Sequence, residues 1–170
     1  MIVSDSGPLI WLARYQLLDL LQKFFDKIVI PYSVYKEVVV VGIKKGYNDA
    51  YEAKDKIDDF IFIKKGKYDK KTIRKIEKSF GITLGKAEED CICLAKELKT
   101  MFLTNDEEAS IVSNKIGIKT KGVLYILLRA VKERMMEKDE VLKIFEKMIE
   151  DGFWINPQTV LQFRELMEKM

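Results

Sequence analysis

Residues 1–11 read Met-Ile-Val-Ser-Asp-Ser-Gly-Pro-Leu-Ile-Trp, and this stretch predicts a strand followed directly by a helix. Ile2 and Val3 are β-branched and apolar, which favours a short buried strand. A turn through Gly7 follows, and Pro8 is expected at the first helical position. Asp5 therefore lies where the strand ends and the helix begins. A carboxylate at such a junction either caps the helix or has a functional role.

The same alternation of a short apolar strand and a helix continues along the chain. Further strands are expected at 27–30, 60–63, 101–104 and 118–120, with helical spacing of apolar residues between them. This pattern predicts an α/β fold, a three-layer α/β/α domain with a parallel central sheet. Additional helices are expected at 122–135, at 139–150 and from Pro157 onwards. We therefore expect residues 1–170 to form a single domain, with C-terminal helices from about residue 122 packed on it.

The composition narrows the class of protein. The 170 residues are 48% hydrophobic and 34% charged, which is typical of a folded soluble domain. Apolar runs are shorter than the roughly 20 residues of a membrane span, so we expect a cytoplasmic protein that does not contact a membrane. Cys91 and Cys93 are two apart in a helical pattern, which favours core positions over a disulfide or metal site.

The sequence contains no histidine. This excludes Ser-His-Asp and Cys-His nucleophilic machinery and histidine-ligated zinc. Any catalysis must then rely on carboxylates, on lysines or on a metal held by oxygen. The net charge is only +3, but Lys and Arg residues cluster between Lys64 and Lys78. A solvated helix face is the simpler interpretation of that cluster, and a surface for a phosphate backbone is the alternative.

Acidic residues occur at corresponding points of the strand and helix pattern. Asp5 and Asp106 each follow a strand and precede a helix, so they should project from one edge of a parallel sheet. Glu37 is one turn inside a helix, and Glu88 lies beside the apolar stripe of another. Taken singly, each is explained as a helix cap or a border residue. If they converge, their mutual repulsion calls for a cation, and an all-oxygen site suits Mg²⁺ or Mn²⁺.

Four short motifs occur in a fixed order, and each contains one of these acids. They are Ile2-Val3-Ser4-Asp5, Val29-Ile30-Pro31 followed by Val34-Tyr35-Lys36-Glu37, Gly85-x-Ala87-Glu88, and Phe102-Leu103-Thr104-Asn105-Asp106. Together they resemble the motifs of the PIN domain family, compact metal-dependent ribonucleases that include many toxins of toxin-antitoxin pairs. The resemblance covers nearly the whole chain, including the longer helical tail of one subgroup.

The resemblance implies a site and partners. Asp5, Glu88 and Asp106 would be the metal ligands, Glu37 would complete the catalytic set, and Thr104 or Asn105 would be a polar neighbour. In the acidic slot of the third motif, Glu88 is followed directly by Glu89 and Asp90. The implied function is hydrolysis of RNA with Mg²⁺ or Mn²⁺, with single-stranded or looped RNA expected as the substrate rather than a duplex. Candidates for contact with the RNA backbone are Lys86, Lys115 and the Lys64–Lys78 cluster. An antitoxin is a possible partner, and the apolar tail favours a homodimer.

Other classes of function remain open. A non-catalytic PIN-like module that binds RNA or a protein is the main alternative, and it should bind RNA without cutting it. An aspartyl-phosphate enzyme also begins with an Asp after its first strand, but it needs a second acid two residues later, where this chain has Gly7. The paired acids of a receiver domain are not found.

Overall fold

The structure is a computed structural model that describes residues 1–170. Its contacts divide the chain into two compact units, Met1–Gly122 and Val123–Met170. The first unit contains the sheet and all four acids that the sequence singles out. None of the helices is long and apolar enough to cross a membrane.

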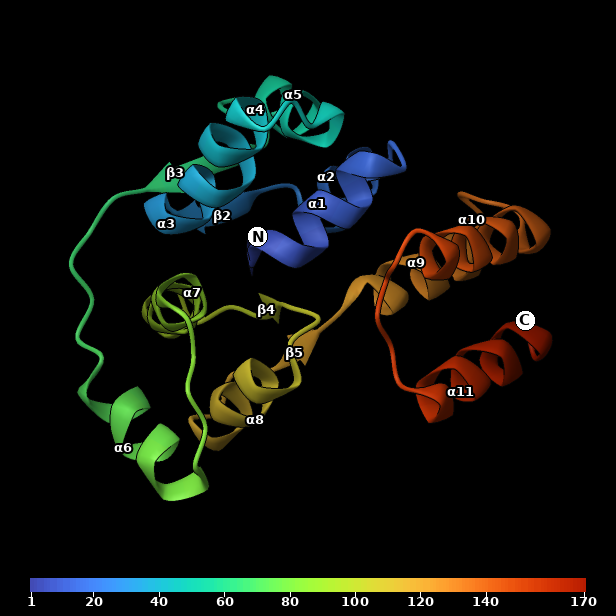
Figure 1. Cartoon of the computed structure of the whole chain (residues 1–170). Helices are drawn as coiled ribbons and strands as arrows, with labels where there is room; N and C mark the ends of the chain where they lie inside the picture. Colours follow the sequence, from blue (N-terminus) through green and yellow to red (C-terminus); the bar gives the residue numbers. More distant parts are fainter. The chain divides into compact units, whose positions relative to one another are not determined.

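The first unit is built on a five-stranded sheet in which every pair of neighbours is parallel (Figure 1). Its order is β3-β2-β1-β4-β5, so β1 is the central strand. Val3 of β1 pairs with Val29 on one side and with Phe102 on the other. The strands are β1 (Ile2–Ser4), β2 (Ile28–Pro31), β3 (Ile61–Lys64), β4 (Phe102–Leu103) and β5 (Thr120–Lys121). The predicted parallel sheet is confirmed.

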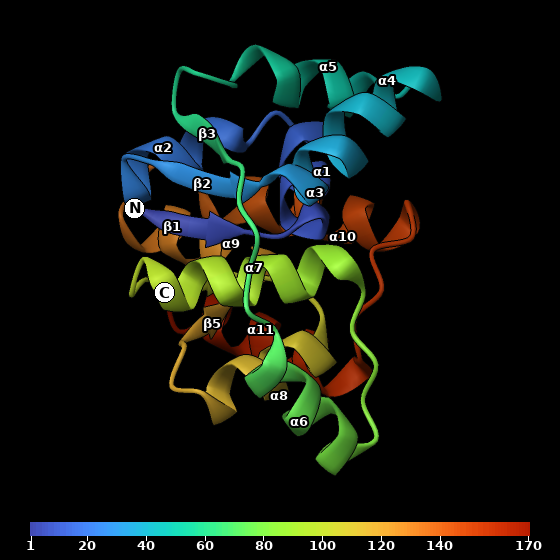
Figure 2. The same cartoon turned by 90° about the vertical axis from the view of Figure 1, so that its left-hand side faces the viewer.

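Helices cover both faces of this sheet (Figures 1 and 2). Helix α7 packs against β1, β2 and β4 on one face, while α1 and α2 lie on the other. The apolar residues of β1 and β4 are fully buried, as expected for central strands of a sheet covered on both sides. The helices of this unit are α1 (Ser6–Arg14), α2 (Leu18–Phe25), α3 (Tyr32–Tyr35), the π-helix η1 (Lys36–Val41), α4 (Gly42–Lys44), α5 (Asn48–Asp55), α6 (Lys71–Phe80), α7 (Lys86–Glu97) and α8 (Glu107–Lys115). The layered α/β/α architecture expected from the sequence is therefore present.

The start of α1 differs from the sequence prediction. The helix begins at Ser6, because the Asp5 carboxylate accepts a hydrogen bond from the Ser6 backbone N–H and caps it. Pro8 is thus the third helical residue and not the first. A proline is tolerated there because the first four backbone N–H groups of a helix have no partner within the helix.

The second unit consists of three helices, α9 (Val123–Lys132), α10 (Lys138–Glu150) and α11 (Pro157–Glu168). Helix α9 contacts both α10 and α11. The rings of Phe145 in α10 and Phe163 in α11 lie 4.4 Å apart between centroids. The three C-terminal helices predicted from the sequence are therefore present. Their packing on the remainder of the chain stays a prediction, as do the homodimer and the antitoxin.

Candidate active site

The sheet topology brings two aspartates to one edge. Asp5 directly follows β1, and Asp106 follows β4 after two residues. Because β1 and β4 are adjacent and parallel, with Ser4 paired to Leu103, both side chains start from the carboxyl edge of the sheet. Ligands of open parallel sheets bind at this edge, so the location is the one expected of a functional site.

Thr104 connects these two aspartates. Its hydroxyl donates a hydrogen bond to Oδ2 of Asp5 (3.3 Å) and accepts one from the backbone N–H of Asp106 (3.1 Å). Asp106 in turn caps α8, because its Oδ1 accepts a hydrogen bond of 2.6 Å from the Ala109 backbone N–H. Capping a helix therefore does not separate the two residues, since both aspartates cap helices and both contact the Thr104 hydroxyl. Thr104 is one of the two residues, with Asn105, that the resemblance implies as a polar neighbour.

Glu37 reaches the same region from the π-helix η1. Its Oε2 accepts a hydrogen bond of 2.5 Å from the hydroxyl of Ser6, the residue that follows Asp5. Short π-helical segments occur frequently at functional sites, because the extra residue per turn changes the direction of the side chains. No functional role for Ser6 was predicted from the sequence. Its position directly after a capping aspartate was the available signal for a second polar group at this edge.

Glu88 lies in the first turn of α7, and its carboxylate folds back toward the start of the helix. There it accepts a hydrogen bond from its own backbone N–H. It also lies against Gly85, the residue before α7. A Cβ atom at position 85 would collide with Oε2 of Glu88. The absence of a side chain at Gly85 therefore creates the space that the Glu88 carboxylate occupies.

The four acids interact through their charges. Burial raises the pKa of Asp5 to about 7. The Ser6 N–H and the Thr104 hydroxyl oppose this rise, whereas the charges of Glu88 and Glu37 add to it. Burial also raises the pKa of Glu88, and the charges of Glu37 and Asp106 act in the same direction. Glu88 thus interacts with each of the other three acids.

The donor chemistry of this set fits a divalent cation of the Mg²⁺ or Mn²⁺ type. All of its ligand atoms are carboxylate oxygens, and the carboxylates repel one another unless a positive charge is present. No three Asp, Glu or Cys side chains in the structure are gathered closely enough to hold an ion together. The fold thus brings the four acids within electrostatic range of one another, and their side chains do not converge on one point.

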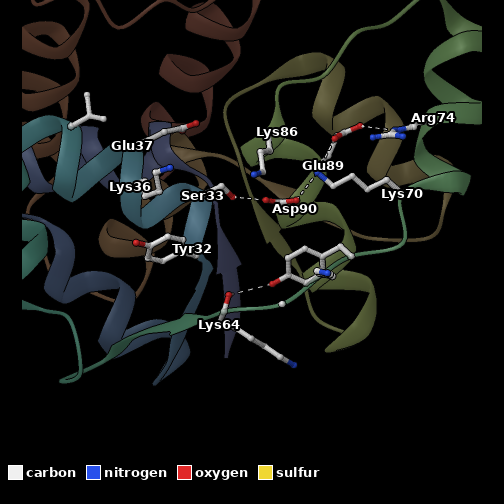
Figure 3. A pocket seen from close by; sticks show the side chains of 14 residues that line it. Tyr32, Ser33, Lys36, Glu37, Lys64, Lys70, Arg74, Lys86, Glu89 and Asp90 are labelled. Atoms are coloured by element: carbon white, nitrogen blue, oxygen red, sulfur yellow. Dashed lines mark hydrogen bonds and ion pairs between the residues drawn. The ribbon is translucent and has the colours of Figure 1, made fainter.

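Glu89 and Asp90 follow Glu88 in α7, but they belong to a separate network. The ammonium group of Lys70 lies 2.6 Å from Oδ1 of Asp90 and 2.8 Å from Oε2 of Glu89. The hydroxyl of Ser33 donates a hydrogen bond of 2.7 Å to Asp90 (Figure 3). Arg74 adds a longer ion pair of 3.7 Å to Glu89. Burial lowers the pKa of Lys70, but its hydrogen bonds to Asp90 and Glu89 outweigh this effect and raise it overall.

A cleft of about 1020 Å³ lies beside this network and extends to Glu37. Its walls come from α3 and η1, from the segment 64–70 with Arg74 of α6, and from the start of α7 (Figure 3). Six cationic side chains line it: Lys36, Lys64, Lys67, Lys70, Arg74 and Lys86. Lys115, a further candidate from the sequence, instead lies with its ammonium group 5.0 Å from the ring centroid of Phe80.

Comparisons with known proteins identify the family. Residues 1–169 match the family model of a PIN domain. A solved domain of a functionally unknown protein from Methanocaldococcus jannaschii is similar to this chain, with 16% sequence identity over 71% of this chain and 89% of that one, and with a TM-score of 0.45. No curated protein matches the chain. Because the match to the family model spans nearly the whole sequence, the chain belongs to the PIN domain family.

Proposed function

We propose that the chain is a divalent-metal-dependent ribonuclease that hydrolyses phosphodiester bonds in RNA. PIN domains are typically nucleases that use Mg²⁺ or Mn²⁺, and the chain belongs to that family. The observation that carries the proposal is the set of interacting acids Asp5, Glu37, Glu88 and Asp106. They come from four separate segments of the chain. Repulsion of this kind seldom persists in a protein unless a cation relieves it.

In the proposed mechanism, Asp5, Glu88 and Asp106 would hold the metal. A Mg²⁺ or Mn²⁺ ion bound there would supply Lewis acidity toward water and would neutralise charge on the phosphate. Thr104 and the Ser6 N–H fix the orientation of the Asp5 carboxylate. The Ser6 hydroxyl orients Glu37, which stays exposed and is placed to accept a proton from the attacking water. No histidine base is needed.

The test is cleavage of a pool of unstructured RNA, with Mn²⁺ or with EDTA, by the wild-type chain and by Asp106→Asn. We expect cleavage only with Mn²⁺ and only by the wild type. Asp139→Asn is the matched control. Asp139 is an exposed residue in the first turn of α10, and the substitution removes the same charge. Cleavage by the Asp106→Asn variant, or cleavage by the wild type in EDTA, would contradict the proposal.

A second candidate is a PIN-like module that binds RNA without cleaving it. The observation in its favour is that no three acids converge closely enough to hold an ion. Such a module should bind the same RNA pool with equal affinity in Mn²⁺ and in EDTA, and it should leave the RNA intact in both. The cleavage assay described above therefore distinguishes the two candidates.

A further inference from the structure

The cations that line the cleft fall into two groups. Three of them are paired with acids of α7. Lys64 pairs with Glu97 at the end of the helix. Lys70 and Arg74 pair with Glu89 and Asp90 near its start. The other three, Lys36, Lys67 and Lys86, form no ion pair. A paired cation has its charge compensated inside the protein, whereas an unpaired cation in a cleft attracts an anionic ligand. The cluster of basic residues seen in the sequence is therefore not one uniform surface.

Two of the unpaired cations face each other beside the candidate active site. Lys36 is the first residue of η1 and precedes Glu37, and Lys86 is the first residue of α7, two positions before Glu88. Their ammonium ends extend toward one another from opposite walls of the cleft (Figure 3). Two like charges converging in this way suit a ligand that has negative charge at successive positions.

An aromatic ring lies on the same wall as Lys36. Tyr32 lines the cleft, and 43% of its surface is exposed. It stacks on Tyr35 with ring centroids 5.8 Å apart, which holds the ring in place. The exposed Lys65 also places its ammonium group 5.2 Å from the centroid of the Tyr32 ring, so a base that stacks there on the same face as Lys65 displaces this cation. Stacking of bases on aromatic side chains beside a positively charged groove is how proteins bind single-stranded nucleic acid. In a duplex the faces of the bases are covered by their neighbours, so a duplex cannot use this ring.

We propose that Lys36 and Lys86 bind two backbone phosphates of a single-stranded RNA next to the acids, while a base stacks on Tyr32. This inference rests on the proposed ribonuclease function and names the substrate-binding residues of that site. Lys70 and Arg74 do not contact the RNA, because Glu89 and Asp90 already compensate their charges.

Binding is measured separately from cleavage, by fluorescence anisotropy of a short labelled RNA in EDTA over a range of salt concentrations. All variants are made in an Asp5→Asn background. Lys36→Ala combined with Lys86→Ala should weaken binding by about tenfold per lysine, the loss expected for one charge-assisted contact. The slope of log affinity against log salt should fall by about 1.4, because each phosphate contact on a single strand contributes roughly 0.7. Tyr32→Ala should weaken binding by about tenfold and leave the slope unchanged.

Lys75→Ala combined with Lys78→Ala is the matched control. Both residues are exposed on α6 and do not line the cleft, and the change in net charge is the same. We expect this pair to keep its affinity within about twofold. An RNA duplex of the same sequence should bind more weakly than the single strand. The inference is wrong if the Lys36 and Lys86 variant binds like the control, or if duplex and single strand bind equally well.

The two proposals fail in different ways. If the wild type does not cleave RNA but the lysine and tyrosine variants lose binding as described, the cleft inference stands and the ribonuclease proposal falls. If the wild type cleaves with Mn²⁺ but the variants bind RNA normally, the ribonuclease proposal stands and the cleft inference falls.

Discussion

Helix α7 contains three successive acids near its start, Glu88, Glu89 and Asp90, and they serve two different regions of the molecule. Glu88 interacts with the acids Asp5, Glu37 and Asp106, and no cation compensates it. Glu89 and Asp90 instead meet Lys70 at hydrogen-bond distance. The two regions thus differ in charge balance, although a single helical turn supplies acids to both.

This difference separates function from stability. Paired acids at Lys70 hold the segment before α6 onto α7 and thereby shape one wall of the cleft. Burial and the neighbouring acidic charges raise the pKa of Asp5 and of Glu88, so the charged forms of these two groups oppose folding when no cation is bound. Removing charge from the acids around Glu88 should therefore abolish activity and spare the fold. Removing charge from the Lys70 network should weaken the fold and spare the chemistry.

The largest expected effect is on cleavage by Asp5→Asn. Loss of a metal-binding carboxylate should lower the rate by more than about 100-fold, beyond the roughly 10- to 100-fold typical of residues that only support a ligand. The side-chain amide that this substitution introduces can still accept the hydrogen bond from the Ser6 backbone N–H and contact Thr104, so the fold should be retained. The rate is measured in Mn²⁺, with circular dichroism as the check on folding. A variant that cleaves like the wild type would remove Asp5 from the site.

Lys70→Met tests the paired region. The Lys70 side chain is only 14% exposed, and its loss leaves Glu89 and Asp90 without their main cation. We expect the free energy of unfolding to fall by about 2 kcal/mol, as measured by urea denaturation. Lys64→Met is the control, because Lys64 and Glu97 form an exposed ion pair worth less than about 1 kcal/mol. Equal losses in the two variants would mean that the Lys70 network has no special structural role.

The pH dependence of stability tests the charge balance of the unpaired region. The pKa of Asp5 in the folded chain is about 7, above its ordinary value of 3.8. The folded state therefore binds this proton more tightly than the unfolded state does. The contribution of Asp5 protonation to the free energy of unfolding is complete below about pH 4 and is lost as the pH rises through 7. The free energy of unfolding then falls by at most about 1.4 kcal/mol per pH unit.

Urea denaturation in EDTA between pH 4 and pH 8 measures this contribution. Asp5→Asn should lack it and should equal or exceed the wild type in stability at pH 8. A wild type that gains stability steadily up to pH 8, relative to the variant, would show that the Asp5 carboxylate is compensated inside the protein.

The smallest expected effect is that of Ser6→Ala. The variant loses the hydrogen bond from Ser6 to Glu37, so Glu37 keeps its charge but not its fixed orientation. A single hydrogen bond of this kind corresponds to roughly a three- to tenfold loss in the rate of cleavage. Ser79→Ala is the control, because the Ser79 hydroxyl bonds only to the Lys75 carbonyl within α6. If both serine variants cleave at the wild-type rate, Glu37 does not depend on Ser6.

The sequence predicted the parallel sheet and the positions of Asp5 and Asp106, because strand ends in a parallel sheet share one edge. Only the resemblance favoured Glu88 over its neighbours Glu89 and Asp90. Successive residues of a helix point in directions about 100° apart, and only the packing of α7 against the sheet determines which one faces the other acids. Contacts between distant residues, such as Ser6 with Glu37, depend on tertiary structure in the same way.

The basic cluster illustrates the same limit. Lys64, Lys70 and Lys75 look alike in the sequence. In the structure, however, Lys64 lies in an exposed ion pair, Lys70 in a partly buried network and Lys75 on an exposed helix face. Lys36 is outside the cluster and was not singled out, although it lines the cleft beside Glu37. Pairing between side chains therefore decides which cations are available to a ligand, and pairing is a property of the fold.

The most direct test of the account compares Mn²⁺ binding by Glu88→Gln and Glu89→Gln, followed by electron paramagnetic resonance of free Mn²⁺. The two changes are identical in chemistry and one residue apart. If the acids around Glu88 form the cation site, Glu88→Gln should bind Mn²⁺ at least about tenfold more weakly than the wild type, whereas Glu89→Gln should bind it with wild-type affinity. Equal binding by the two variants, or a loss confined to Glu89→Gln, would contradict the account.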